Sequence, residues 1–297
     1  MISVNNVTKS FDGFKALDGL TMNVPAGSIY GLVGPNGSGK STIIRHICGA
    51  YRPDSGDILV DGQPVYENTA VKERMFVIPD DSYYFSQASV RDMMKFYRGI
   101  YPQFDSERFE KLRGVFELDE KRPIRKMSKG MQKQAAFWLA ISLRPEVLIL
   151  DEPVDGLDPV MRRQVWGLLM SDVAERGTTV LVASHNLREL EDVCDHVGIL
   201  SRGKVLLERS LSELQDNIKK LQFVPNETGA MPEGLDILSS HAAGRMHTLI
   251  VRGQSEQILS AAAAAAPVYY EEIPLTLEEI FIYELGGADY AVKDIIL

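Results

Sequence analysis

A glycine-rich segment at residues 34–42, Gly-Pro-Asn-Gly-Ser-Gly-Lys-Ser-Thr, has the residue types and spacing of a phosphate-binding loop. Glycines let backbone N–H groups turn inward around an anion, a geometry that side chains would block. Lys40 offers a positive charge to the β and γ phosphates, and Ser41 offers a hydroxyl to Mg²⁺. The chain is therefore predicted to bind a nucleoside triphosphate, and the predicted contacts are Asn36, Gly37, Ser38, Gly39, Lys40, Ser41 and Thr42.

Two acids follow the apolar strand predicted at residues 147–150. Ligands bind at the carboxyl ends of such strands, so Asp151 is placed to hold Mg²⁺, directly or through water. Its neighbour Glu152 could polarise a water for attack on the γ phosphate. His185 follows another apolar strand, 179–183, and can donate to a γ-phosphate oxygen or hold the attacking water. Lys40, Glu152 and His185 are thus the predicted catalytic residues.

The composition limits the classes of protein to consider. The 297 residues include 32 Lys and Arg against 41 Asp and Glu, a net charge of −9, whereas a dedicated nucleic-acid binder more often has a basic face. The two cysteines have no partner at metal-ligand spacing, so neither a zinc site nor a disulfide framework is indicated. No apolar run approaches the roughly 20 residues of a membrane span. We expect a cytoplasmic protein whose membrane role would require a separate spanning partner.

The elements that position these residues follow from apolar patterns. Continuous apolar runs indicate strands of a sheet that is covered on both faces, and helical patterns alternate with them, so an α/β core is expected. Strands are predicted at 2–7, 20–24, 28–33, 57–60, 75–78, 147–150, 179–183, 196–200 and 205–208. Helices are predicted at 42–47, 90–100, 106–115, 131–142, 161–176 and 187–195.

The long stretch between the phosphate loop and Asp151 predicts an inserted helical subdomain at about residues 80–140, since a simple strand–helix–strand crossover uses far fewer residues. Residues 1–208 are therefore expected to form one domain. From 209 to 297 the phosphate-type motifs stop, and a small α+β accessory domain is expected.

Within this accessory domain, helices are predicted at 212–220 and 258–266, and strands at 221–224 and 248–251. The six alanines at 261–266 are good helix formers, although a low-complexity linker is the alternative. Thr276 and Glu279 have the spacing of a capping box that opens a last helix, with Gly286 and Gly287 as its predicted end.

The motifs taken in order resemble the ATP-binding cassette (ABC) family over about residues 1–208. The phosphate loop is followed by Met-Ser-Lys-Gly-Met-Gln (127–132), Leu-Asp-Glu-Pro (150–153), Gly-Leu-Asp-Pro (156–159) and His185. This resemblance implies a P-loop NTPase core, a mixed sheet with flanking helices, with ATP and Mg²⁺ bound. We call the segment 127–132 the signature motif. Its Ser-Lys-Gly-Met form, and the segment Leu-Glu-Glu-Ile-Phe near the end of the chain, resemble those of ATPase subunits of bacterial drug, antibiotic or peptide exporters with separate membrane subunits.

The resemblance also implies roles for further residues. Phe11 would stack on adenine, with core packing as the alternative. Ser128 and Gly130 would contact the γ phosphate of ATP held by a second cassette, so that two cassettes close over two nucleotides. Read without the family, Ser128 is an N-cap, an alternative that stays open. Asp158 would line the seam of this homodimer or heterodimer.

Three departures from the family pattern affect the expected activity. Asp80 stands where a glutamine is usual, and its shorter, charged group changes the contact with metal or water. Lys129 and Met131 replace Gly and Gln in the signature, and Gln134 replaces a common arginine. Because the predicted catalytic residues remain, we expect a slow enzyme and not an inactive one.

An aromatic and methionine stripe leaves two interpretations open. Its spacing is helical, which is typical of core, but adaptable side chains also suit a groove that accepts a helix of a membrane subunit. The stripe consists of Tyr83, Tyr84, Phe85, Val90, Met93, Met94, Tyr97 and Tyr101.

The expected function is an ATP-hydrolysing transporter subunit, peripheral on the cytoplasmic face of a membrane. The alternatives are a non-transport ABC ATPase that acts on DNA or ribosomes, and a regulatory ATP sensor with slow turnover. The first alternative would usually carry long heptad segments, a second cassette or strong basic patches, and none is found in the sequence.

Overall fold

A computed structural model describes residues 2–227 and 229–284. The chain divides into two compact units, residues 1–208 and 209–297. Each unit has a hydrophobic core of its own.

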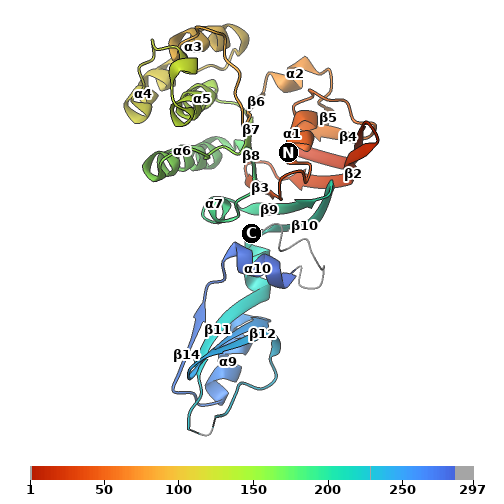
Figure 1. The fold of residues 1–297 in the computed structure, drawn as a ribbon, viewed down its shortest axis with the longest axis vertical. Coiled ribbons are helices and arrows are strands. Elements are labelled where there is room, and N and C mark those ends of the chain that lie inside the picture. The colour runs from red at the N-terminus through yellow and green to blue at the C-terminus, as the bar shows by residue number, and fades with distance from the viewer. Residues whose placement is uncertain (1, 228, 285–297) are drawn as a thin grey trace. The chain divides into compact units, whose positions relative to one another are not determined.

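The first unit contains two sheets (Figure 1). The strands are β1 (Ile2–Phe11), β2 (Phe14–Val24), β3 (Ile29–Val33), β4 (Ser55–Val60), β5 (Gln63–Pro64), β6 (Met75–Ile78), β7 (Val147–Asp151), β8 (Thr179–Ser184), β9 (His196–Ser201) and β10 (Lys204–Ser210). One sheet has the order β2-β1-β4-β5 and is antiparallel, whereas the other has the order β10-β9-β3-β8-β7-β6. The predicted α/β core with a mixed set of strands is confirmed.

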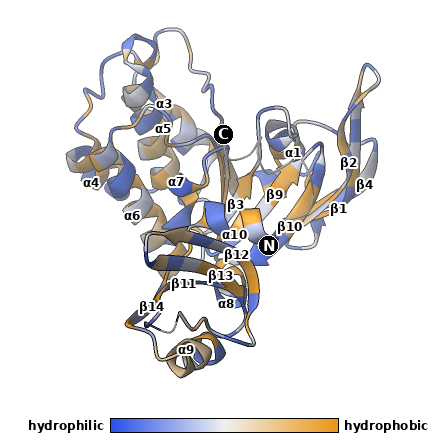
Figure 2. Cartoon of the chain, turned by 60° about the horizontal axis from the view of Figure 1, so that its bottom comes forward, coloured by the Kyte–Doolittle hydropathy of each residue, from blue (hydrophilic) through white to orange (hydrophobic). Residues whose placement is uncertain are grey.

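The parallel part of the second sheet brings the predicted site residues to one edge. Strands β9, β3, β8, β7 and β6 are parallel neighbours. In their register, Val33 pairs with Ser184 and Asp151 pairs with Ala183. The segments that follow these strands therefore leave the sheet side by side. Strands β3, β7 and β8 are buried along their whole length, as their continuous apolar sequences predict. Figure 2, which colours the chain by hydropathy, shows hydrophobic residues along strands of the first unit.

The helices of this unit are α1 (Lys40–Ile47), α2 (Thr69–Lys72), α3 (Val90–Ile100), α4 (Ser106–Phe116), α5 (Lys129–Leu143), α6 (Pro159–Arg176) and α7 (Arg188–Glu191). Figure 1 shows α3, α4 and α5 gathered in one helical group. In chain order this group comes after β6 and before β7. The group has its own apolar centre, where Trp138 of α5 stacks on Phe109 of α4 with ring centroids 4.6 Å apart. The indole N–H of Trp138 also donates to the Phe109 carbonyl at 2.8 Å, so a polar atom is satisfied inside this centre.

The second unit is a four-stranded antiparallel sheet of order β12-β13-β11-β14 with one helix packed on it. Its elements are α8 (Leu211–Asn217), β11 (Ile218–Val224), β12 (Asp236–Ala243), β13 (Met246–Arg252), α9 (Ser255–Ala264), β14 (Tyr269–Ile273) and α10 (Leu277–Glu284). Helix α9 contains four of the six alanines, Ala261 to Ala264, so the helical interpretation is confirmed for most of the run. The capping box is confirmed as well, because the Thr276 and Glu279 side chains accept from each other's backbone N–H groups. The predicted end at Gly286 and Gly287 lies outside the described residues.

Two local predictions were wrong, and two strands of the second unit were missed. The helix predicted at 187–195 is short, because Asp195 pairs its backbone and its carboxylate with Ile29 and draws the chain toward β9. The helix predicted at 212–220 ends at Asn217, since Ile218 already pairs with Arg252 in the sheet. Strands β12 and β14 were not predicted, because their side chains are mostly exposed and show no apolar run.

Candidate active site

The phosphate loop joins β3 to α1 and has a backbone that only glycine adopts without strain. Gly37 has φ of 79° and Gly39 has φ of 112°, both in the left-handed region. A Cβ added at Gly39 would lie 2.9 Å from the Ala16 carbonyl oxygen, so the glycine also permits a close approach of two chain segments. Helix α1 begins directly after Gly39, and this places its free N–H groups beside the loop.

The loop lines a cavity of about 290 Å³. The predicted site residues found in its wall are Asn36, Gly37, Gly39, Lys40, Ser41, Thr42, Asp80, Asp151 and Glu152. Ser38 is not in the wall; its buried hydroxyl has no hydrogen-bond partner within the described part of the chain. The cavity thus combines backbone donors, one ammonium group and three carboxylates.

Lys40 is held inside the loop itself. Its ammonium group donates to the Gly34 carbonyl at 2.6 Å and lies 3.9 Å from a Glu152 carboxylate oxygen. Burial lowers the pKa of Lys40, while the charges of Glu152 and Asp151 oppose that shift. The charge is therefore held by neighbouring oxygens, a role that phosphate oxygens can take over.

Asp151 ends β7 as a buried carboxylate next to Ser41 of α1. Burial raises the pKa of Asp151, a hydrogen bond from the Ser41 side chain opposes this, and the nearby charges of Glu152 and Asp80 add to the rise. The carboxylates of Asp151 and Asp80 and the hydroxyl of Ser41 line one cavity and form a set of hard oxygen donors. Such a set fits Mg²⁺, because this ion prefers oxygen ligands and also keeps several waters.

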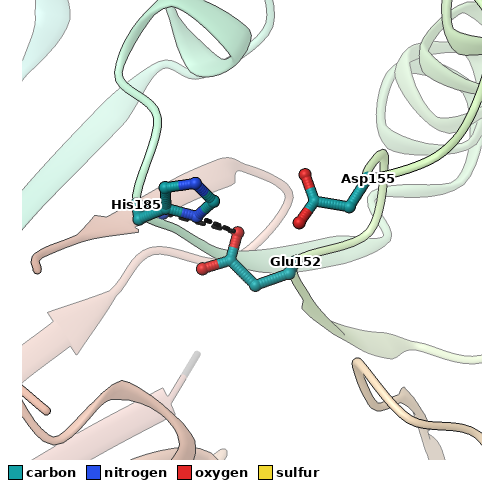
Figure 3. Close-up of side chains that lie close together, drawn as sticks. All are labelled: Glu152, Asp155 and His185. Atoms are coloured by element: carbon teal, nitrogen blue, oxygen red, sulfur yellow. Dashed lines mark hydrogen bonds and ion pairs between the residues drawn. The ribbon is translucent and has the colours of Figure 1, made fainter. Parts of the chain in front are cut away.

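Glu152 follows Asp151 but faces a different group. Its carboxylate faces the His185 ring (Figure 3) and lies 2.9 Å from Nδ1. It also accepts from the His185 backbone N–H at 3.4 Å. Asp155 lies beside this pair, and one ligand atom from each of the three residues lies within 4.8 Å of the others. His185 is half exposed and does not line the phosphate cavity. The structure therefore brings Glu152 and His185 together at the edge of the cavity.

The backbone of Glu152 is strained. Its φ is 45°, in the left-handed region that costs a residue with a side chain about 1–3 kcal/mol. The Glu152 N–H donates to the Ala183 carbonyl at 2.9 Å, and its carbonyl accepts from the ammonium group of Lys133. Lys133 also lies 3.4 Å from Asp80.

Ser128, Gly130 and Asp158 are not brought to the phosphate cavity of their own chain. Ser128 is the N-cap of α5, and its hydroxyl accepts from the Met131 N–H at 3.3 Å. A Cβ at Gly130 would lie 2.5 Å from the Gly156 carbonyl oxygen, so the start of α5 lies against the segment before α6. Asp158 caps α6 and accepts from two of its N–H groups.

Phe11 is also outside the cavity wall. Its ring packs edge-on against Tyr51 with centroids 5.7 Å apart and is partly exposed. Phe14, at the other end of the same hairpin turn, lines the cavity with Ala16. Sequence reasoning missed Phe14, although its place just after the Asp12-Gly13 turn could have indicated it. It also missed Lys133 and Asp155, which lie next to recognised motifs and have partners far away in the chain.

Among the described residues, no helix is both long enough and apolar enough to cross a bilayer. The family model described as "ABC transporter" matches residues 17–155. The chain is 32% identical to the ABC transporter ATP-binding protein YtrB of Bacillus subtilis over 97% of its own length and 99% of that protein. It is also 32% identical to the daunorubicin/doxorubicin resistance ATP-binding protein DrrA of Streptomyces peucetius, over 88% of this chain and 74% of that one.

A solved structure described as an ATP-binding subunit of an ABC transporter has the same fold. It superposes with a TM-score of 0.67 at 25% identity and covers 72% of this chain and 92% of its own. The match to YtrB over nearly the whole chain and the order of the motifs in the sequence agree with this likeness. The chain therefore belongs to the ATP-binding ATPase subunits of the ABC transporter family.

Proposed function

We propose that this chain is the ATP-hydrolysing subunit of an exporter, and that it pairs with a second cassette and drives a separate transmembrane subunit. The observation that carries the hydrolytic part is the cavity in which the phosphate loop and Lys40 face Asp151 and Glu152. A cavity with this combination of charges suits a triphosphate, because the loop and Lys40 bind the anion while the acids serve metal and water.

Each residue at the cavity has a separate part in this proposal. The loop N–H groups and Lys40 hold the β and γ phosphates, and Ser41, Asp151 and Asp80 would hold Mg²⁺. The ion, when bound, neutralises charge on the phosphate oxygens. Glu152 accepts a hydrogen bond from the attacking water and polarises it. His185, in contact with Glu152 at 2.9 Å, orients that carboxylate and can donate to the γ phosphate.

Pairing with a second cassette would complete the site. Ser128, Gly130 and Asp158 lie outside the phosphate cavity of their own chain, yet Ser128 stands at the positive end of the fifteen-residue helix α5. Such an end suits an anion that is supplied by another subunit. The two copies could be identical or different, and either arrangement would place ATP at the seam.

Export is supported by relatives and by the signature motif. DrrA is described as a daunorubicin/doxorubicin resistance protein, and resistance through a transporter requires that the compound is moved outward. The cargo must cross through another chain in this proposal, so the cassette would work on the cytoplasmic face of a membrane, bound to its transmembrane subunit.

An aromatic patch on the helical group is the candidate docking surface for that subunit. Tyr84, Val90, Met93 and Met94 of the stripe are core residues. The exposed apolar side chains are Tyr83, Phe85, Phe96 and Ile100, and we call these four residues the aromatic patch. The rings of Phe85 and Phe96 pack edge-on, with their centroids 5.2 Å apart. A neighbouring cavity of about 230 Å³, lined partly by Tyr83, Tyr84 and Tyr97, gives the patch a recess for an apolar helix.

The test is hydrolysis by the variant Glu152→Gln. The change keeps the size of the side chain but removes the carboxylate, so phosphate release should fall at least a hundredfold while ATP binding is retained. Steady-state phosphate release and equilibrium ATP binding, measured on both proteins, distinguish the outcomes. Equal rates would refute the assigned role of Glu152.

Binding without turnover in the unaltered protein would favour an ATP sensor, and the observation behind this alternative is that the charge of Asp80 acts on Asp151.

A further inference from the structure

We propose that Lys133 is a positioning residue that holds Glu152 in its working orientation and links it to the signature helix α5. The inference rests on the proposed function, because it takes Glu152 as the residue that polarises water. Lys133 stands in the second turn of α5, five positions after Ser128 (133 − 128). None of the motifs recognised in the sequence includes Lys133.

The ammonium group of Lys133 lies between two segments of the site. It donates to the backbone carbonyl of Glu152 and lies 3.4 Å from the carboxylate of Asp80. Its side chain is only 11% exposed, whereas that of Asp80 is 62% exposed. Water screens the pair with Asp80, so the bond to the less exposed Glu152 carbonyl is the stronger of the two contacts.

The Glu152 carbonyl needs a donor because the backbone there departs from the strand. With φ at 45°, Glu152 is turned into the left-handed region directly after β7, and its N–H is fixed to Ala183 at 2.9 Å. Lys133 fixes the carbonyl side of the same residue. The two bonds clamp the peptide units on both sides of the Glu152 Cα and so fix the direction in which its side chain leaves the backbone, from which the carboxylate reaches His185.

Lys133 also lines a second cavity of about 550 Å³, with Asp80, Gln132, Asp155 and Gly156 in its wall. This cavity lies between the start of α5 and the segments that follow β6 and β7. A shift of α5 would therefore move the Lys133 ammonium relative to Glu152. The geometry points to a direct link between the helix that begins at Ser128 and the carboxylate that polarises water.

The test compares Lys133→Met, which removes the donor and its charge, with Lys133→Arg, which retains both. Phosphate release by Lys133→Met should fall about tenfold in kcat with an unchanged KM for ATP, since Lys133 does not line the phosphate cavity. Lys133→Arg should retain at least half of the unaltered kcat. Lys95→Met is the matched control, because Lys95 is exposed on α3 of the same helical group and should leave both constants unchanged.

ATP affinity is measured in the Glu152→Gln background, where turnover does not interfere. Equal affinity with and without Lys133→Met supports a role in positioning alone. Unaltered kcat in Lys133→Met, while Glu152→Gln is inactive, would overturn the inference and leave the proposed function intact. A parallel loss of ATP affinity and melting temperature in both Lys133 variants would also overturn it, since Lys133 would then be a general support of the fold. Turnover that survives Glu152→Gln would overturn both proposals.

Discussion

The two consecutive acids at the end of β7, Asp151 and Glu152, have different surroundings. Asp151 completes the strand, is buried and faces Ser41. Glu152 lies beyond the strand, with a left-handed backbone that turns its carboxylate toward His185. A dipeptide of acids could not separate two roles if both side chains shared one environment. In the proposed function one acid serves metal and the other serves water, and the left-handed backbone of Glu152 accounts for the difference in their surroundings.

The buried His46 predicts how stability depends on pH. Burial lowers the pKa of His46 below its ordinary value, so the folded chain favours the neutral ring. Its stabilising contribution is complete above about pH 6.5, where the unfolded histidine is neutral too, and it is lost as pH falls through that value toward the lowered pKa.

We expect the variant His46→Phe, which keeps a ring against Tyr51, to lose less stability between pH 7 and pH 5 than the unaltered protein. Urea unfolding across this range measures the difference. His241→Phe is the control, because His241 is exposed and the change should leave the pH dependence as it was. An identical slope for His46→Phe would show that this residue does not contribute to acid sensitivity.

At the scale of elements, two features at the start of α5 have a structural explanation. Ser128 caps the helix, and Gly130 lies where a side chain would meet the Gly156 carbonyl. Both features would be present in a helix without any ligand. The cap and the proposed contact with a γ phosphate can therefore be separated only by a change that retains one and removes the other.

The variant Ser128→Asp makes that separation. Aspartate caps helices about as well as serine and suits the positive end of a helix, so the free energy of unfolding should change by less than about 0.5 kcal/mol. Its negative charge would repel a γ phosphate, so kcat should fall at least tenfold. Ser128→Ala, which should cost about 1 kcal/mol of stability, is the comparison for a lost cap. Full activity in Ser128→Asp would reduce Ser128 to an N-cap.

At the scale of the whole molecule, the proposed cycle needs two cassettes that close on ATP. A ligand at a thousand times its dissociation constant biases an equilibrium by about 4 kcal/mol, which is enough to drive closure without new contacts elsewhere. We expect Glu152→Gln, which cannot reset the cycle, to double its mass by light scattering when ATP is added. The unaltered protein should return to the smaller mass as ATP is consumed. An unchanged mass with ATP, even with the transmembrane subunit present, would refute the paired cycle.

The aromatic patch predicts how the cassette meets its membrane partner. Tyr83 is 75% exposed, so Tyr83→Glu should leave folding and ATP binding intact while it weakens co-purification with the transmembrane subunit at least tenfold. A charge at Tyr84 would not test this, because that ring is buried and the change would damage the core. Tyr66→Glu, at an exposed ring outside the patch, is the control. Retained binding in Tyr83→Glu would place the partner elsewhere.

Local sequence determined much of this protein. The phosphate loop, the two acids at the end of β7 and the alternation of strands and helices were predictable, because glycine geometry and apolar periodicity act within a few residues. Helix α3 begins and ends where its pattern predicted, between its Ser89 cap and Tyr101. The family resemblance added the expected roles of Ser128 and Asp158, which nothing in their local sequence required.

Tertiary structure alone decided the rest. The place of Lys133 depends on Glu152 and Asp80, which lie 19 and 53 positions away, and no local pattern encodes such contacts. The same holds for Asp155 beside His185. Short-range propensities fix which segments become strands and helices, but side chains from separate segments meet only after the sheet register has brought the ends of those segments together.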